Sequence, residues 1–118
     1  MRRALATLAL CLPGLAGAGE AQVLDAVAAC DAARVCQFAV TVRHADAGWD
    51  HYADAWVVRA PDGSELGRRV LLHPHDDEQP FTRHLGGVRV PAGIDTVQVV
   101  AHDSVHGWGA TGVAVPIR

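Results

Sequence analysis

Six of the seven histidines lie in three short segments that also carry carboxylates. The first segment runs from His44 to Tyr52, the second from His73 to Glu78, and the third from His102 to Trp108. Imidazole nitrogens and carboxylate oxygens are typical ligands of transition-metal ions, and several loops can supply them to one ion. The pattern therefore predicts a metal site, but it defines no reaction and leaves enzyme activity open.

His44 and His51 are the histidines of the first segment, and they lie too far apart in the sequence to share a tight turn. A loop that folds back on itself would bring them together. The alternative is that Trp49 and Tyr52 cap one end of the fold, while the histidines form local hydrogen bonds. We favour the metal site because the pattern of histidine and carboxylate occurs in three segments.

His73-Pro74-His75 places two imidazoles on either side of a proline. The proline restricts the backbone and so pre-organises a pair that can chelate an ion if the chain bends. The acidic residues that follow, from Asp76 to Glu78, would raise the affinity for a cation or fix an imidazole tautomer. A solvated acidic turn is the better explanation of these three acids.

His102 and His106 bracket the turn of the third segment. His102 falls in the outward-facing phase of the preceding strand, whereas Asp103 falls in the phase that faces the core. His84 lies in the middle of a predicted strand beside Arg83, which indicates a surface position. We predict that the ligands are His44, His51 and His106, completed by His102, His73 or His75.

Ligands rich in nitrogen and lacking sulfur suit Cu(II), Zn(II) or non-haem Fe(II), and the general order of affinity favours copper. A blue-copper site would need a thiolate and usually a thioether. The single methionine is Met1, and no free cysteine is expected.

The N-terminus has the features of a secretory signal peptide. Met1-Arg2-Arg3 is a basic start, residues 4–12 form a short apolar run, and Ala16-Gly17-Ala18 offers a site for cleavage after small residues. A lipoprotein signal ending at Cys11 fits less well, because bulky Leu10 precedes the cysteine. We predict a signal peptide over residues 1–18, a mature domain over 19–118 with no membrane span, and a periplasmic or secreted location.

Charge and cysteine content fit this prediction. The chain carries 10 basic and 13 acidic residues, and the basic ones are all arginine. This acidic balance disfavours nucleic acid as a partner and suits a protein that attracts cations. Cys30 and Cys36 form an even pair in an exported chain, which predicts a disulfide across a hairpin turn.

Strand-like segments alternate with turn signals along the mature chain, and no segment has helical periodicity. In the clearest example, residues 35–43, Phe38, Val40 and Val42 share one face. Trp56 sits on the third strand, where an immunoglobulin-like domain usually fills the space between its sheets. The predicted strands cover residues 23–30, 35–43, 54–60, 66–72, 81–90, 96–101 and 111–117.

This pattern predicts an all-β fold, an immunoglobulin-like antiparallel β-sandwich of about seven strands. The three histidine-rich segments are then the connections after the second, fourth and sixth strands. In a Greek-key sandwich these connections lie at the same end, so the fold would gather the three segments into one site.

The order of these motifs resembles the iron domain of desulfoferrodoxin-type superoxide reductases, itself an immunoglobulin-like sandwich. That family has a histidine, then His-Tyr and a nearby tryptophan, and later Cys followed by His-Gly and a tryptophan. Here the matching residues are His44, His51-Tyr52, Trp56 and His106-Gly107-Trp108, with spacings that differ by one residue. The resemblance implies that His44, His51 and His106 are nitrogen ligands.

The chain departs from this family at two ligands. The position of the family's axial cysteine is Asp103, or His102 if one residue is inserted, and no histidine precedes the first motif. His73 or His75 would have to replace the missing ligand. Without a thiolate the iron loses its strongest electron donor, so metal handling and redox chemistry on an oxygen species both stay open.

Two further interpretations of the same loops stay open. In the first, exposed Trp49, Tyr52 and Trp108 form a recognition surface for another exported protein. In the second, hydrogen-bonded pairs of histidine and aspartate only cap the sandwich.

Overall fold

The computed structural model describes residues 19–118, so the expected signal peptide lies outside the described residues. These residues form an all-β sandwich of two antiparallel sheets, which confirms the predicted fold class. No helix in the described range is long and apolar enough to cross a membrane.

One sheet contains β1 (Gln22–Cys30), β2 (Val35–Arg43) and β5 (Phe81–Arg89), in the order β1-β2-β5. The other contains β4 (Glu65–Val70), β3 (Ala53–Arg59) and β6 (Thr96–Asp103), in the order β4-β3-β6. Two short strands, β7 (Gly107–Trp108) and β8 (Val113–Pro116), both pair with β6.

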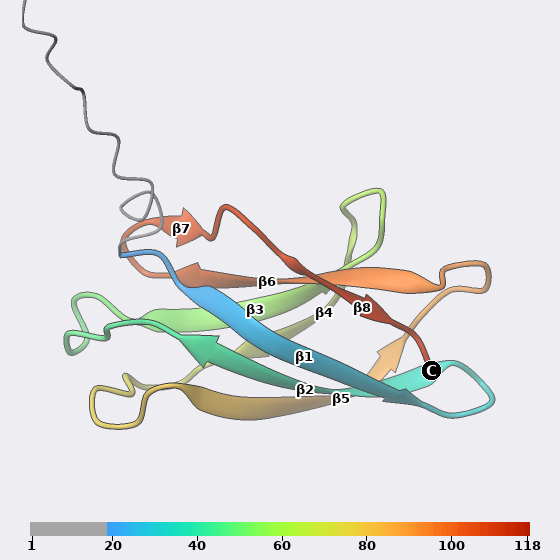
Figure 1. Cartoon of the computed structure of the whole chain (residues 1–118), viewed down its shortest axis with the longest axis horizontal. Helices are drawn as coiled ribbons and strands as arrows, with labels where there is room; N and C mark the ends of the chain where they lie inside the picture. The colour runs from blue at the N-terminus through green and yellow to red at the C-terminus, as the bar shows by residue number, and fades with distance from the viewer. Residues whose placement is uncertain (1–18) are drawn as a thin grey trace, which may run out of the picture.

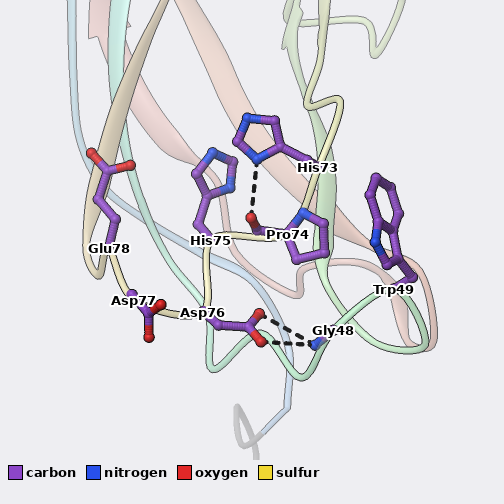
Figure 2. Close-up of a pocket in the computed structure, with 8 residues that line it drawn as sticks. All are labelled: Gly48, Trp49, His73, Pro74, His75, Asp76, Asp77 and Glu78. Atoms are coloured by element: carbon purple, nitrogen blue, oxygen red, sulfur yellow. Dashed lines mark hydrogen bonds between the residues drawn. The ribbon is translucent and has the colours of Figure 1, made fainter.

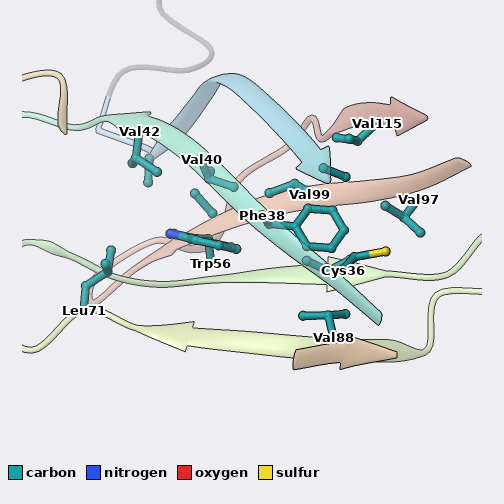
Figure 3. Packing of buried hydrophobic residues seen from close by; sticks show 14 of the residues in the cluster. Cys36, Phe38, Val40, Val42, Trp56, Leu71, Val88, Val97, Val99 and Val115 are labelled. Atoms are coloured by element: carbon teal, nitrogen blue, oxygen red, sulfur yellow. The ribbon is translucent and has the colours of Figure 1, made fainter. Parts of the chain in front are cut away.

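The core fills the space between the two sheets (Figure 3). Phe38, Val40 and Val42 of β2 are fully buried, as their alternation predicted. Trp56 of β3 is fully buried as well and packs between the sheets. Burial of these large apolar side chains provides the main favourable free energy for the sandwich.

The observed strands differ from the predicted ones mainly at their ends. β4 ends at Val70, before exposed Leu72, and β8 spans only Val113–Pro116. β6 continues to Asp103, and its last two residues pair with the two residues of β7. Strand β7 was not among the predicted strands, because these residues were expected to lie in a loop. β5 is continuous through its glycines, with a register shift against β2 between Cys36 and Phe38.

The two ends of the sandwich differ in their connections (Figure 1). The loops after β2, β4 and β6 all lie at one end, as the sandwich topology predicted. The described chain begins at the same end, where the Gly19 carbonyl contacts His44. The β1–β2 hairpin and the C-terminus lie at the other end. At that end the predicted disulfide joins Cys30 to Cys36.

Candidate metal centre

His44, His51 and Asp103 converge at the loop end of the sandwich. His44 follows the last residue of β2, His51 lies at the end of the same loop, and Asp103 is the last residue of β6. The two strands fix His44 and Asp103, whereas the loop folds back and brings His51 against both. Each of the three contributes one atom to a group whose members all lie within 4.8 Å of one another.

Three atoms form the centre of this cluster. Nε2 of His44 lies 3.2 Å from Nε2 of His51, which lies 3.1 Å from Oδ1 of Asp103. The second carboxylate oxygen of Asp103 lies 3.9 Å from Nε2 of His44. Ligand atoms about 2.0–2.1 Å from a tetrahedral metal lie roughly 3.3 Å apart, so the observed separations suit a single ion.

Asp46 orients His44 from behind. Its Oδ1 lies 2.6 Å from Nδ1 of His44 and also accepts the backbone N–H of Ala53 at 3.0 Å. Its Oδ2 accepts the backbone N–H of His75 at 2.7 Å, and the Asp46 side chain is fully buried. Because the Asp46 carboxylate is an acceptor, Nδ1 of His44 is the nitrogen that donates to it, and this tautomer turns the lone pair of Nε2 toward His51 and Asp103.

Asp103 is fully buried, and backbone amides hold it in place. Its Oδ1 accepts the N–H groups of Val105 at 2.9 Å and His106 at 2.7 Å. Burial alone raises the pKa of this carboxyl, but these two hydrogen bonds and the neighbouring His44 and His106 outweigh it, so the pKa lies below its usual value. Asp103 is therefore an anion at neutral pH.

The residues of the cluster fit a cation. Oδ2 of Asp103 is buried and has no hydrogen-bond partner. A buried, unpartnered carboxylate oxygen costs free energy unless a positive charge compensates it. Two imidazole nitrogens and this carboxylate together make a donor set that Zn(II), Cu(II) and Fe(II) all accept.

His106 lies at the rim of the cluster. Its Nδ1 is 3.2 Å from Oδ1 of Asp103, and its ring centre is 4.9 Å from that of His51. Its side chain is 40% exposed, so the ring can turn. In the described geometry His106 donates to the Asp103 carboxylate and does not belong to the group formed by His44, His51 and Asp103.

His102 faces the opposite side of its strand, as the sequence phase predicted. Its Nδ1 pairs with a carboxylate oxygen of Asp54, and its ring packs edge-on against Trp108, with centres 4.6 Å apart. The structure therefore places His102 on the outer face of the sheet, away from the cluster.

His73 and His75 lie in a separate hollow formed with Trp49 and the acidic turn (Figure 2). Their rings are side by side with centres 4.6 Å apart, and His75 also stacks on Phe81 at 4.0 Å. Burial, followed by Arg83 and His73, lowers the pKa of His75 below its ordinary value. His75 is 5% exposed, and neither of its ring nitrogens has a hydrogen-bond partner.

The sequence analysis missed two residues of this arrangement. The sequence placed Asp103 in the core-facing phase and at the position of the family's cysteine, but Asp103 was not among the predicted ligands. Asp46 lies in a loop without a regular period, so no sequence signal marked it.

No protein-family model matches the chain, and no solved structure matches it. A protein of Halomicrobium mukohataei named a putative lipoprotein is 43% identical over 96 residues. The match covers 81% of this chain and 47% of that protein, so the chain spans about half the length of this relative.

Proposed function

We propose that this protein is an exported β-sandwich domain that binds one transition-metal ion through His44, His51 and Asp103. The observation that carries the proposal is the convergence of two imidazole nitrogens on a buried carboxylate that has an unpartnered oxygen. His106, at the rim, would become a further ligand if its ring turned toward the ion.

Three features support export. The sequence predicts a signal peptide, the described domain contains a disulfide, and a relative bears the name putative lipoprotein. Disulfides persist in oxidising compartments, such as the bacterial periplasm or the exterior of the cell. We propose a periplasmic or secreted location on these grounds.

Two imidazoles and one carboxylate are also the donor set of non-haem Fe(II) oxygenases, in which further positions stay open. Together with the resemblance to desulfoferrodoxin-type superoxide reductases, this supports redox chemistry on an oxygen species as a finer proposal. Asp103 would take the place of the thiolate as the anionic ligand. The Fe(II)-loaded protein should then consume superoxide faster than Zn(II)-loaded protein, and equal rates would leave metal handling as the role.

Metal analysis of the purified protein tests the binding proposal. Residues 19–118 would be loaded with copper, zinc and iron in turn, dialysed, and measured by inductively coupled plasma mass spectrometry. We expect about one ion per chain with at least one of the metals, and loss of binding in His51→Ala. Fewer than about one ion per five chains with every metal would refute the proposal.

His84, an exposed residue of β5, provides the matched control. His84→Ala removes an imidazole from the surface that is not part of the cluster. His84→Ala should bind as much metal as the unaltered protein. Equal losses in His84→Ala and His51→Ala would mean that binding is not specific to the cluster.

A recognition surface is the second candidate, and the exposure of Trp49 favours it. Trp49 is 65% exposed and packs edge-on against Tyr52, with ring centres 5.5 Å apart. Trp108, by contrast, is partly covered by Arg59 and Arg68. A recognition surface predicts that Trp49→Ala impairs partner capture, while His51→Ala leaves it unchanged.

A further inference from the structure

We propose that Gly19 completes the metal site, through its carbonyl oxygen and through the α-amino group that it gains when the chain is cut before it. This inference rests on the proposed function, because it adds ligands to the site of His44, His51 and Asp103. On this proposal, the site reaches its full metal affinity only after the signal peptide is cleaved during export.

The carbonyl of Gly19 already lies in the cluster. Its oxygen is 2.9 Å from Nε2 of His44 and 3.3 Å from Nε2 of His51. These distances match the separations among the other three donors of the site. When Nδ1–H of His44 donates to Asp46, the lone pair of Nε2 faces the Gly19 oxygen, and a cation bound by both would make this contact favourable.

Only glycine fits at this position. Gly19 has φ +88°, and a Cβ built on it would lie 2.6 Å from Cε1 of His106. A side chain at residue 19 would therefore displace the His106 ring, which itself lies against Asp103. The close approach of the backbone to the cluster requires a residue without a side chain.

Neighbouring residues hold Gly19 in place. Glu20 accepts the backbone N–H of Ala110 through Oε1 at 2.7 Å, and Ala21 is buried. Gly109 passes so close to this segment that a Cβ on it would lie 2.7 Å from the carbonyl oxygen of Ala21. The carbonyl of Gly19 is thus positioned by the fold rather than by the residues that precede it.

The predicted cleavage site lies directly before this residue. Ala16-Gly17-Ala18 carries the small residues that signal cleavage requires, so Gly19 is the expected first residue of the mature chain. Hydrolysis of the Ala18–Gly19 peptide bond consumes one water, and leaves a carboxylate on Ala18 and an amine on Gly19. Sequence and geometry thus point independently to the same residue.

Cleavage changes the chemistry of the Gly19 nitrogen. In the uncut chain it is an amide nitrogen, whose lone pair is delocalised and does not bind Zn(II). In the cut chain it is an amine with an ordinary pKa of about 7.7–8.0, which loses a proton on binding a metal. Amine and carbonyl of one residue can close a five-membered chelate ring, and glycine has the backbone freedom to form it.

Zinc titration of three chain forms tests the proposal. The first form begins at Gly19 with a free amine, the second is the same chain with an acetylated amine, and the third begins at Ala18. All three contain the complete described fold, so their metal-free melting temperatures should agree. We expect the free Gly19 form to bind zinc at least about tenfold more tightly than the other two, which lack the amine ligand; this is no less than the loss of a group that only supports a ligand would cause.

Equal zinc affinities in all three forms would overturn the role of the amine. His51→Ala in the free Gly19 form separates this result from failure of the proposed function. If that variant loses zinc while the three forms bind equally, the site exists and the amine has no part in it. If even the free Gly19 form binds no zinc, the role of Gly19 in a zinc site fails, whereas the proposed function is decided by the copper and iron loadings described above.

Two further measurements complete the test. Intact mass of the protein recovered from an exporting cell should give Gly19 as the first residue, and a lipid-modified chain beginning at Cys11 would overturn the proposal. Gly19→Ala in the acetylated chain should weaken zinc binding, because the positive φ and the His106 ring both disfavour a Cβ at residue 19, and circular dichroism of the metal-free variant checks that the domain still folds. Unchanged affinity in that variant would show that zinc binding does not need the backbone conformation that places the Gly19 carbonyl in the cluster.

Discussion

The molecule contains two groups of histidines at the same end, and their geometry differs. In the cluster of His44, His51 and Asp103, imidazole nitrogens point at each other and at a buried carboxylate. In the pair of His73 and His75, the rings are tilted by 37° to each other, and His75 stacks on Phe81. The first group directs ring nitrogens to a common point, whereas in the second His75 buries a ring face against Phe81 and His73 stays exposed.

The difference shows that residue type alone does not determine how the imidazoles are oriented. Both groups combine histidine with acidic neighbours, and both lie on loops. Only the first has a carboxylate, Asp46, that sets a tautomer, and a second carboxylate, Asp103, that meets the free nitrogens. The orientation of the imidazoles, rather than their number, makes the first group the better metal site.

Asp103→Asn should produce the largest effect. Asparagine keeps an oxygen that can accept the amides of Val105 and His106, but it removes the negative charge from the site. We expect zinc or copper affinity to fall by about 100-fold or more, measured by competition with a chelator. The control is Asp50→Asn, which alters an exposed aspartate of the first loop and should not change affinity. A 100-fold loss of affinity in both variants would contradict the conclusion that the metal binds at the cluster of His44, His51 and Asp103.

Asp46→Asn should have the next largest effect, because it disturbs the orientation of His44 without touching the ion. Asparagine has one acceptor oxygen and one NH2 group, which is a donor. The NH2 group would therefore face either Nδ1–H of His44 or the backbone N–H of His75, and neither donor would have an acceptor. We expect a loss of about 10–100-fold in metal affinity. We also expect about 1–3 kcal/mol less free energy of unfolding in the metal-free protein. An unchanged metal affinity would show that Asp46 does not set the His44 tautomer.

Replacement of both cysteines by serine should lower stability and leave metal binding intact. The disulfide closes a short loop at the end of the sandwich opposite the cluster (Figure 1). Its loss should cost about 2 kcal/mol of unfolding free energy, measured by urea denaturation. A large fall in the metal affinity of the folded protein would mean that the two ends are coupled.

His75 should make the metal-free protein less stable at low pH. Its folded pKa lies below the unfolded value of about 6.5, so the unfolded chain binds more protons between the two values. The contribution of neutral, buried His75 to the free energy of unfolding is fully present above about pH 6.5, and it is lost as the pH falls toward the folded pKa. His75→Phe, which keeps an aromatic ring over Phe81, should lose less stability between pH 8 and pH 5 in urea titrations. An identical pH dependence in His75→Phe and the unaltered protein would show that His75 does not titrate in this way.

Trp49→Ala should have the smallest effect on stability. The side chain is mostly exposed and contacts Tyr52 only edge-on, so the unfolding free energy should change by less than about 0.5 kcal/mol. Metal affinity should stay the same. A fall in metal affinity that matches the effect of Asp103→Asn would show that the hollow around His73 and His75 takes part in binding.

Most of the fold could be predicted from the sequence, because strands with one buried face alternate regularly. The pattern of Phe38, Val40 and Val42, and the tryptophan at position 56, identified the sandwich and its core. The same reasoning separated His102 from Asp103 by the phase of β6. Strand β7 was not predicted, since two residues carry no period.

The site was predictable only in outline. Strand order brought the three loops to one end, but the ring directions within a loop depend on backbone turns that no period describes. His73 and His75 therefore fitted the sequence pattern as well as His51 did. Gly19 gave no signal as a ligand, because a backbone carbonyl has no residue type.

Anomalous X-ray scattering from crystals of the metal-loaded protein tests the central claim most directly. The account predicts one strong peak about 2.0–2.2 Å from Nε2 of His44, Nε2 of His51 and a carboxylate oxygen of Asp103. A peak between His73 and His75, with none at the cluster, would contradict it.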